Sequence, residues 1–470
     1  MEPPLEREAT WRAHDMAAPG RIPTAHSLEL DDYFAGPRDM QRHSKLPYFM
    51  RLHGSILPKM IIPLAIVGAW ATLITCISRL VFKLGVNSIL LTVLGFVVGL
   101  SLSFRSTTAY ERYNDGRKYW SQLIMTSRNL ARLIWLHIDE RYDVSEEQGK
   151  ADLLAKLTAI NLISAFAVAL KHRLRFEPAT EYPDLEPLVA HLDTMAGSAD
   201  QARLRRSERT PWKAAGEYLG IPFAESNPRK LIKRAEDNLG NVPLEILTHL
   251  TAYIDHAMKG RQLSLPIHQT WAMNNIGSLT DVLTGTERVL NTPLPIAYTI
   301  SISQITWTYV MILPFQLYNY LEWVTIPGTI VAAYIILGLA TIGKEIENPF
   351  GNDVNDLPLD HYCHEIAADM DVLTATPAPD IDEFVNSERN WPLYPLSMTG
   401  YAGWEKRSVA DIRDALRAKA TSGAKAVQSE RARPNGEGAK LSLSQTQTQS
   451  QTRPVTQQTR TQTEVHTDAV

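Results

Sequence analysis

The sequence predicts an all-α membrane protein with four transmembrane helices per subunit and a large helical region in water. Four windows long enough to cross a bilayer contain no charged residue, and the aqueous remainder places apolar residues at helical spacing with no strand-like alternation. The windows are residues 60–78, 84–104, 294–321 and 323–343. The whole-chain hydrophobic content of 44% is typical of a soluble protein and hides these windows, because the average mixes two populations of segments.

The N-terminal segment 1–55 is polar and rich in proline, and it contains no apolar core of the kind that a cleavable signal peptide has. The spans are therefore expected to insert by themselves. The first span, 60–78, opens a membrane domain that we place at 56–375.

The second span, 84–104, passes into the polar sequence FRSTTAYERYNDGRKYWS without turn residues, which predicts one continuous helix. Two stripes run along it at four-residue spacing, so each lies on one helical face. A bulky stripe contains Phe96, Leu100 and Phe104, and its line continues outward to Ser88 and Thr92. The neighbouring stripe contains Gly95, Gly99 and Ser103, the small residues that allow close packing of helices in lipid.

The block 105–290 follows the second span and is predicted to be helical. The apolar run AINLISAFAVAL within it has 12 residues, too few to span a membrane, and indicates a buried core helix. Proline, glycine and charge predict loop and short helix over 173–228, whereas 229–259 and 267–291 show the helical period again.

The third span contains Pro314, which predicts a kink because proline removes a helical hydrogen bond. After the fourth span we expect a peripheral segment, 376–420, and a Ser/Thr/Gln-rich tail, 421–470. The tail has almost no apolar residues to bury and is predicted to be disordered.

Basic residues are more frequent before the first span and after the second span than in the turn between these two spans, where the basic residues are Arg79 and Lys83. This predicts that both termini and the block 105–290 are cytosolic. The net charge of −4 and the scattered basic residues argue against a nucleic-acid partner. The two cysteines, Cys76 and Cys363, lie in different environments and predict no disulfide framework.

Catalytic patterns are also missing from the sequence, which predicts that the protein is not an enzyme. No nucleophile or phosphate-loop constellation is visible, and the histidines of the aqueous block have no ligand spacing with one another. They are His137, His172, His249, His256 and His268.

Three segments resemble motifs of the bestrophin family, whose members form pentameric anion channels. FRSTTAYERYNDGRKYW at 104–120 is similar to the family signature after the second span, although Tyr113 stands where many members have Trp. TERVLNTPLPIAYT at 286–299 and IENPFGNDVNDLPLD at 346–360 are similar to the segments around the last two spans. The resemblance covers about 40–375, favours the prokaryotic and fungal branch, and leaves an insert at 196–211 without a counterpart.

The resemblance implies a chloride channel whose pore lies on the symmetry axis of a homo-oligomer, a pentamer by analogy, embedded in a bilayer. Four spans are too few to surround a water path, which agrees with an axial pore. Matching positions assign the pore neck to Phe96, Leu100 and Phe104, where apolar rings would gate by dewetting, and a cytosolic aperture to Ile267. The alternatives are that the stripe faces lipid and that Ile267 is a core residue.

Anion selectivity has weaker signals. The second span has no acidic residue, and Ser88, Thr92 and Arg105 could favour an anion, as could helix N-termini. Arg105 serves equally well as an interfacial charge that fixes the depth of the span.

The acidic segment after the fourth span offers oxygen ligands of the kind that Ca²⁺ prefers, at Glu345, Asn348, Asp353 and Asp356. It lacks the spacing of an EF-hand, but in animal bestrophins the corresponding segment forms a calcium clasp. A regulatory Ca²⁺ site is therefore an expectation beside the plainer interpretation of a turn before a helix. No cofactor is expected to be required, and chloride is the expected permeant ion.

Two other functions stay open on the sequence. A secondary anion transporter would usually show paired repeats and broken helices around a midplane site. A membrane-anchored helical scaffold would use the cytosolic block alone.

Overall fold

The computed structural model describes residues 54–86, 89–198 and 239–431. The chain divides into two compact units, Met1–Ala378 and Pro379–Val470. All regular structure in the described residues is helical. The first unit contains the membrane helices and the aqueous block, and it is described first.

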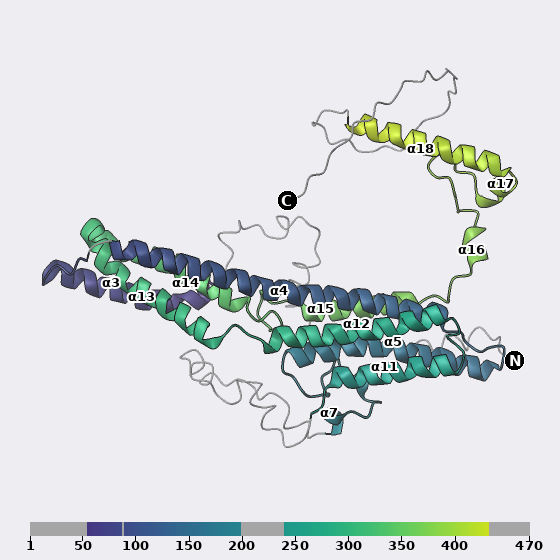
Figure 1. Ribbon diagram of the computed structural model, residues 1–470, viewed down its shortest axis with the longest axis horizontal. Helices are drawn as coiled ribbons and strands as arrows, with labels where there is room; N and C mark the ends of the chain where they lie inside the picture. The colour runs from purple at the N-terminus through teal and green to yellow at the C-terminus, as the bar shows by residue number, and fades with distance from the viewer. Residues whose placement is uncertain (1–53, 87–88, 199–238, 432–470) are drawn as a thin grey trace, which may run out of the picture. The chain divides into compact units, whose positions relative to one another are not determined.

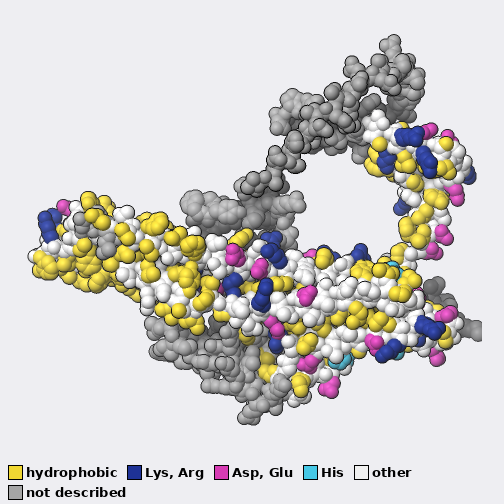
Figure 2. All heavy atoms as spheres, in the orientation of Figure 1, with side chains coloured by type: hydrophobic (Ala, Val, Ile, Leu, Met, Phe, Trp, Pro, Cys, Tyr) yellow, Lys and Arg dark blue, Asp and Glu magenta, His cyan; other side chains and the backbone are white. Residues whose placement is uncertain are grey.

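Four helices gather at one end of the first unit, where the surface is almost wholly apolar (Figures 1 and 2). They are α3 (Leu57–Leu80), the first part of α4 (Ile89–His137), α13 (Ile296–Leu321) and α14 (Thr325–Glu345). α13 and α14 are joined by a single 3₁₀ turn, η3 (Glu322–Val324). The protein is therefore an integral membrane protein with the four spans that the sequence predicts.

The second span begins at Ile89, which corrects the predicted start at residue 84. Residues 82–86 are not helical, because they pack against the end of α13. The Val86 N–H donates to the Phe315 carbonyl at 3.1 Å. A Cβ on Gly85 would stand 1.8 Å from the Asn319 amide oxygen, so any other residue would require the Asn319 side chain to move.

α4 is one helix of 49 residues, about 74 Å long at 1.5 Å per residue. Its first part packs against α13 and α14, and its second part packs against α5, α12 and α15. The predicted continuity of membrane and aqueous helix is confirmed, and α4 is the element that joins the two regions.

The aqueous block consists of α5 (Glu146–Leu174), α11 (Val242–Lys259), α12 (Pro266–Asn291) and α15 (Leu359–Thr374), packed with the second part of α4 (Figure 1). By length and composition α5 could cross a membrane, but 67% of its apolar window is buried, against 22–33% in the other candidates. α5 is thus the core helix that its short apolar run predicts.

The predicted loop after α5 contains the short helices α6 (Glu186–Val189) and α7 (Met195–Ser198). Residues 199–238, which include most of the insert at 196–211, lie outside the described residues. Pro314 is buried inside α13, which is helical on both sides of it, and the kink stays a prediction.

The second unit contains α16 (Ile381–Val385), α17 (Tyr401–Glu405) and α18 (Val409–Arg431). α18 corrects the predicted start of the tail at 421, because the helix continues through TSGAKAVQSER. Alanine, lysine, glutamine, glutamate and arginine are good helix formers, so this stretch supports a helix although it has little to bury. The N-terminal residues 1–53 and the tail 432–470 lie outside the described residues.

Candidate ion pathway

The bulky stripe of α4 faces away from the rest of its own chain. Phe96 is 73% exposed, Leu100 46% and Phe104 58%. The opposite face carries Val98 and Leu102, which are 3% and 4% exposed and pack with Ile302 of α13. One face of α4 therefore holds the helix in its subunit, and the other presents three large apolar side chains to lipid or to other copies of the chain.

The small stripe divides into two parts. A Cβ on Gly95 would lie 3.1 Å from the Tyr309 hydroxyl oxygen, so Gly95 serves packing against α13 within the subunit. A Cβ on Gly99 would meet no atom within 4 Å, and Ser103 is exposed. Gly99 and Ser103 are thus available to a neighbour.

The residues expected to favour an anion lie in different places. Thr92 is exposed on α4, and Ser88 lies outside the described residues. The Arg105 side chain is only 5% exposed and points to the end of α14, where its Nη2 lies 3.8 Å from Glu347 Oε2. The burial of Arg105 and this ion pair favour its role as an interfacial charge that fixes the depth of the span over a role in attracting anions.

Arg112 links α4 to the C-terminus of α12 and to the segment that follows α14. Its guanidinium donates to the backbone carbonyls of Val289 and Thr292 at the C-terminus of α12, and to the Glu347 carbonyl after α14 at 2.9 Å. The last carbonyls of a helix have no partner inside it, which is why a partly buried arginine satisfies them here. Burial lowers the pKa of Arg112, and Glu347 partly opposes this effect.

Ile267 lies in the first turn of α12 and is 70% exposed, so the structure does not bury it in the core. The next residue, His268, contacts His137 at the end of α4, with ring centroids 3.9 Å apart. No local pattern in the sequence relates these two histidines, because they are far apart in the chain and only the tertiary fold brings them together.

Two carboxylates of the acidic loop that starts at the end of α14 pair with a lysine from the start of α3. Lys59 Nζ lies 3.3 Å from Glu345 Oε1 and 3.2 Å from Asp353 Oδ2. Asp356 accepts a hydrogen bond from the Asp353 backbone N–H at 2.7 Å, and burial raises the pKa of Asp356 to about 7. The loop borders a cleft of about 920 Å³ between the spans and the aqueous block.

These side chains, as they lie, do not fit a Ca²⁺ site. The Lys59 ammonium group stands between two of the four candidate ligands, Glu345 and Asp353, and a third, Asn348, is exposed. Across the described residues no three His, Cys, Asp or Glu side chains converge in a way that could hold a metal ion. A cation bound by carboxylates in this loop would have to displace the lysine.

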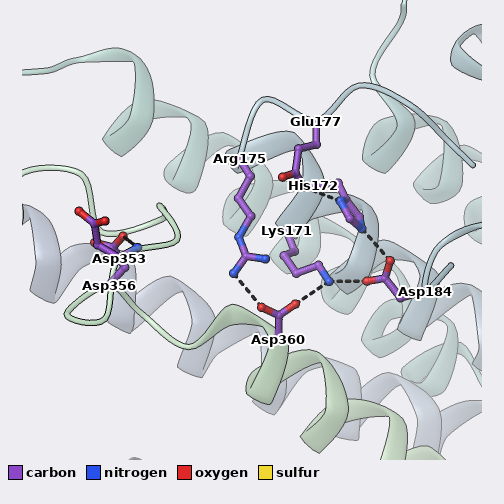
Figure 3. Close-up of polar contacts among 8 residues, drawn as sticks. All are labelled: Lys171, His172, Arg175, Glu177, Asp184, Asp353, Asp356 and Asp360. Carbon is purple, nitrogen blue, oxygen red and sulfur yellow. Dashed lines mark hydrogen bonds and ion pairs between the residues drawn. The ribbon is translucent and has the colours of Figure 1, made fainter. Parts of the chain in front are cut away.

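An ion network centred on the buried side chains of Lys171 and His172 joins α5 to α15, and no local pattern in the sequence indicates it (Figure 3). Asp360 of α15 accepts from Lys171 at 2.8 Å and from Arg175 at 2.8 Å, and Lys171 also contacts Asp184. His172 lies between two carboxylates. Its Nδ1 is 2.8 Å from Glu177 and its Nε2 is 3.0 Å from Asp184.

The network favours the protonated form of His172. Burial alone would lower its pKa, but the bonds with Asp184 and Glu177 outweigh burial, so the pKa is raised. The same contacts hold the pKa of Asp184 well below its ordinary value. Figure 3 shows this network apart from the acidic loop that holds Asp353 and Asp356. We assign it a structural role, because each charge in it faces an opposite charge.

Together these features define a class: an all-helical integral membrane protein in which one long helix exposes an apolar stripe in the membrane and continues into an aqueous helical block. Residues 38–372 match the family described as Bacterial/Fungal Bestrophin protein. The chain belongs to this bacterial and fungal bestrophin family.

Similar proteins agree with this assignment. A voltage-dependent anion channel-forming protein of Synechocystis sp. is 32% identical over 329 residues, which cover 70% of this chain and 91% of that protein. A protein of Nostoc sp. with the same description is 32% identical, with 69% and 90% covered. A crystal structure described as that of a membrane protein covers 68% of this chain and 99% of its own at 22% identity, with a TM-score of 0.50, and shares the fold.

Proposed function

We propose that this protein is an anion-selective channel that conducts chloride passively through an axial pore in a homo-oligomer, with five subunits by analogy with the bestrophin family. The observation that carries the proposal is the stripe of Phe96, Leu100 and Phe104, which lies opposite the packed face of α4. The family membership and the names of the relatives as anion channel-forming proteins support it.

The geometry of one subunit supports an axial pore. Four spanning helices cannot enclose a water path, so one helix from each subunit must line it. α4 suits this role because its Gly99 and Ser103 are open to a neighbour while the bulky stripe lies on the adjacent face. From Phe96 to Phe104 the stripe covers about 12 Å of helix. Five copies would form stacked apolar rings that gate by dewetting.

The aqueous end would supply a second constriction at Ile267. α12 begins there without a side-chain cap, so its first N–H groups and its dipole add positive potential near the exit. This potential favours anions. In α4, which would line the membrane part of the pore, the first acidic residue after Ile89 is Glu111, so no carboxylate in the span repels an anion. We place both termini and the aqueous block on the cytosolic side, as the basic residues indicate.

Conduction on this proposal requires no enzyme chemistry and no bound cofactor. Lys59 pairs with Glu345 and Asp353, two of the four candidate ligands, so we do not assign a gating role to Ca²⁺. A chelator should leave the rate of chloride flux unchanged, and a fall in flux that added Ca²⁺ restores would contradict this part.

Chloride flux from liposomes tests the function. Purified protein is reconstituted into vesicles loaded with KCl, and chloride release is followed with an electrode after valinomycin is added to carry potassium. Release that depends on valinomycin and on the protein is expected, because passive anion flow must be balanced by a cation. Release that is no faster than from empty vesicles would overturn the proposal.

A further inference from the structure

The end of α4 meets the beginning of α12 through two histidine rings. His137 is the last residue of α4, and His268 lies in the first turn of α12. Their ring planes are inclined by 31° at a centroid distance of 3.9 Å. Trp271, one turn further along α12, has its ring 6.1 Å from His137 at 61°. Both histidines are half-buried, so they contact each other and remain accessible to protons.

The surroundings leave these rings with little compensating charge. Asp139, in the turn after α4, is the carboxylate that raises the pKa of His137, but burial and the nearby His268 outweigh it, and the pKa is lowered. Two ion pairs join α5 to the segment after α4 at this end. From α5, Lys156 binds Glu140 at 2.9 Å and Asp152 binds Arg141 at 2.7 Å.

Ile267, the residue predicted to form the cytosolic aperture, lies beside this contact. Ile267 immediately precedes His268, and the α11–α12 turn that leads to it is fixed to the turn after α4. The Asp139 N–H donates to the Gln262 carbonyl at 2.9 Å, and the Gln262 side chain donates to the Asp139 carbonyl at 3.1 Å. The far end of α12 is held by Arg112. Between these two fixed points, the His137–His268 contact joins the first turn of α12 to the end of α4.

We propose that the His137–His268 contact is a proton-operated latch on the cytosolic aperture of the channel, an inference that rests on the proposed function. Neutral rings pack and hold the first turn of α12, with Ile267, against the end of α4. A proton on His137 places a positive charge inside this ring contact, and the first turn of α12 separates from α4. Acid on the cytosolic side then widens the aperture by releasing Ile267.

Two variants remove the charge and keep the aromatic contact: His137→Phe and His268→Phe. His256→Gln is the matched control, because His256 is an exposed histidine of the neighbouring helix α11. The first measurement is the fluorescence of Trp271 in the purified full-length protein, taken as the difference from a Trp271→Phe variant. A protonated ring next to Trp271 quenches it, so the signal should titrate with a midpoint below pH 6.5. Both phenylalanine variants should lose or displace this titration, and the control should keep it.

The second measurement is single-channel conductance as the cytosolic side is taken from neutral to mildly acidic pH. The wild type and His256→Gln should conduct more at acidic pH, and the double variant His137→Phe/His268→Phe should lose that dependence. A Trp271 signal that does not titrate overturns the latch, as does a conductance that ignores pH in the wild type or still follows pH in the double variant. Absence of current at every pH would instead overturn the proposed function, which keeps the two failures apart.

Discussion

Leu100 and Leu102 are the same residue type two positions apart on α4, and they should behave in opposite ways when changed to alanine. Leu100 is 46% exposed on the bulky stripe, whereas Leu102 is 4% exposed and packs with Val98 and Ile302. Leu100→Ala should change single-channel conductance and leave stability nearly intact. Leu102→Ala should reduce stability and leave conductance unchanged.

The magnitudes follow from burial. Truncating a buried leucine leaves a cavity and costs about 2–5 kcal/mol, and Leu102 has the exposure of a core residue. Full burial of a leucine side chain stabilises a fold by about 1.5–3 kcal/mol, and a half-exposed leucine makes about half of the contacts. Leu100→Ala should therefore lower the free energy of unfolding by about 1 kcal/mol or less. Widening an apolar ring lowers the free-energy barrier to wetting of the pore. Each decrease of about 1.4 kcal/mol in this barrier raises the rate of ion flow tenfold.

The assays are denaturation of the purified protein in detergent and bilayer recording of the same preparations. Leu102→Ala should unfold at lower temperature or denaturant concentration, with the unitary current of the wild type in the channels that remain. The reasoning is refuted if Leu100→Ala leaves the unitary current unchanged, or if Leu102→Ala alters it as much as Leu100→Ala does. The first result would mean that the bulky stripe faces lipid, and the second that the current does not distinguish the two faces of α4.

Three further predictions concern the two stripes and the ion network around His172. The double variant Phe96→Ala/Phe104→Ala should raise conductance or abolish gating in bilayer recordings, because it removes two of the three rings. Gly99→Leu should prevent assembly, measured as oligomer mass, while it fits within the subunit; Gly95→Leu should instead destabilise the subunit, because a Cβ there already meets Tyr309 at 3.1 Å. His172 has a raised pKa, so its ion pairs stabilise the fold fully below the ordinary histidine value of 6.5, and the contribution is lost as pH rises through the raised value. His172→Gln should remove this loss from the pH dependence of unfolding.

Each of these has a contrary result. A double phenylalanine variant with wild-type current would place the rings outside the pore. Normal oligomers of Gly99→Leu would show that this glycine does not face a neighbour. Identical pH dependence of unfolding in the wild type and His172→Gln would mean that Asp184 and Glu177 do not hold the proton on His172.

The membrane architecture could be predicted from the sequence because it depends on local properties. Uncharged length identified the four spans, and helical spacing identified the two stripes and the core helix α5. The start of α4 was wrong by five positions, since Gly85 and Val86 follow tertiary contacts with α13 that no local pattern contains. The extent of α18 was missed because low hydrophobicity predicts disorder even where helix propensity is good.

The candidate site was predictable only where one helix carries it. Phe96, Leu100 and Phe104 share a face by spacing alone. Three features required the fold: the His137–His268 contact, the Lys59 bridge to the acidic loop, and the capping of α12 by Arg112. Their partners come from segments far apart in the chain, and such pairs have no signature in a single sequence.

The reversal potential of the purified protein in a planar bilayer tests the central claim most directly. With a tenfold KCl gradient, an anion-selective pore should reverse near the chloride equilibrium potential, about 59 mV from zero. A coupled transporter would give no unitary steps, and a cation channel would reverse at the opposite sign. Reversal at the potassium potential, or the absence of protein-dependent current, would contradict the account.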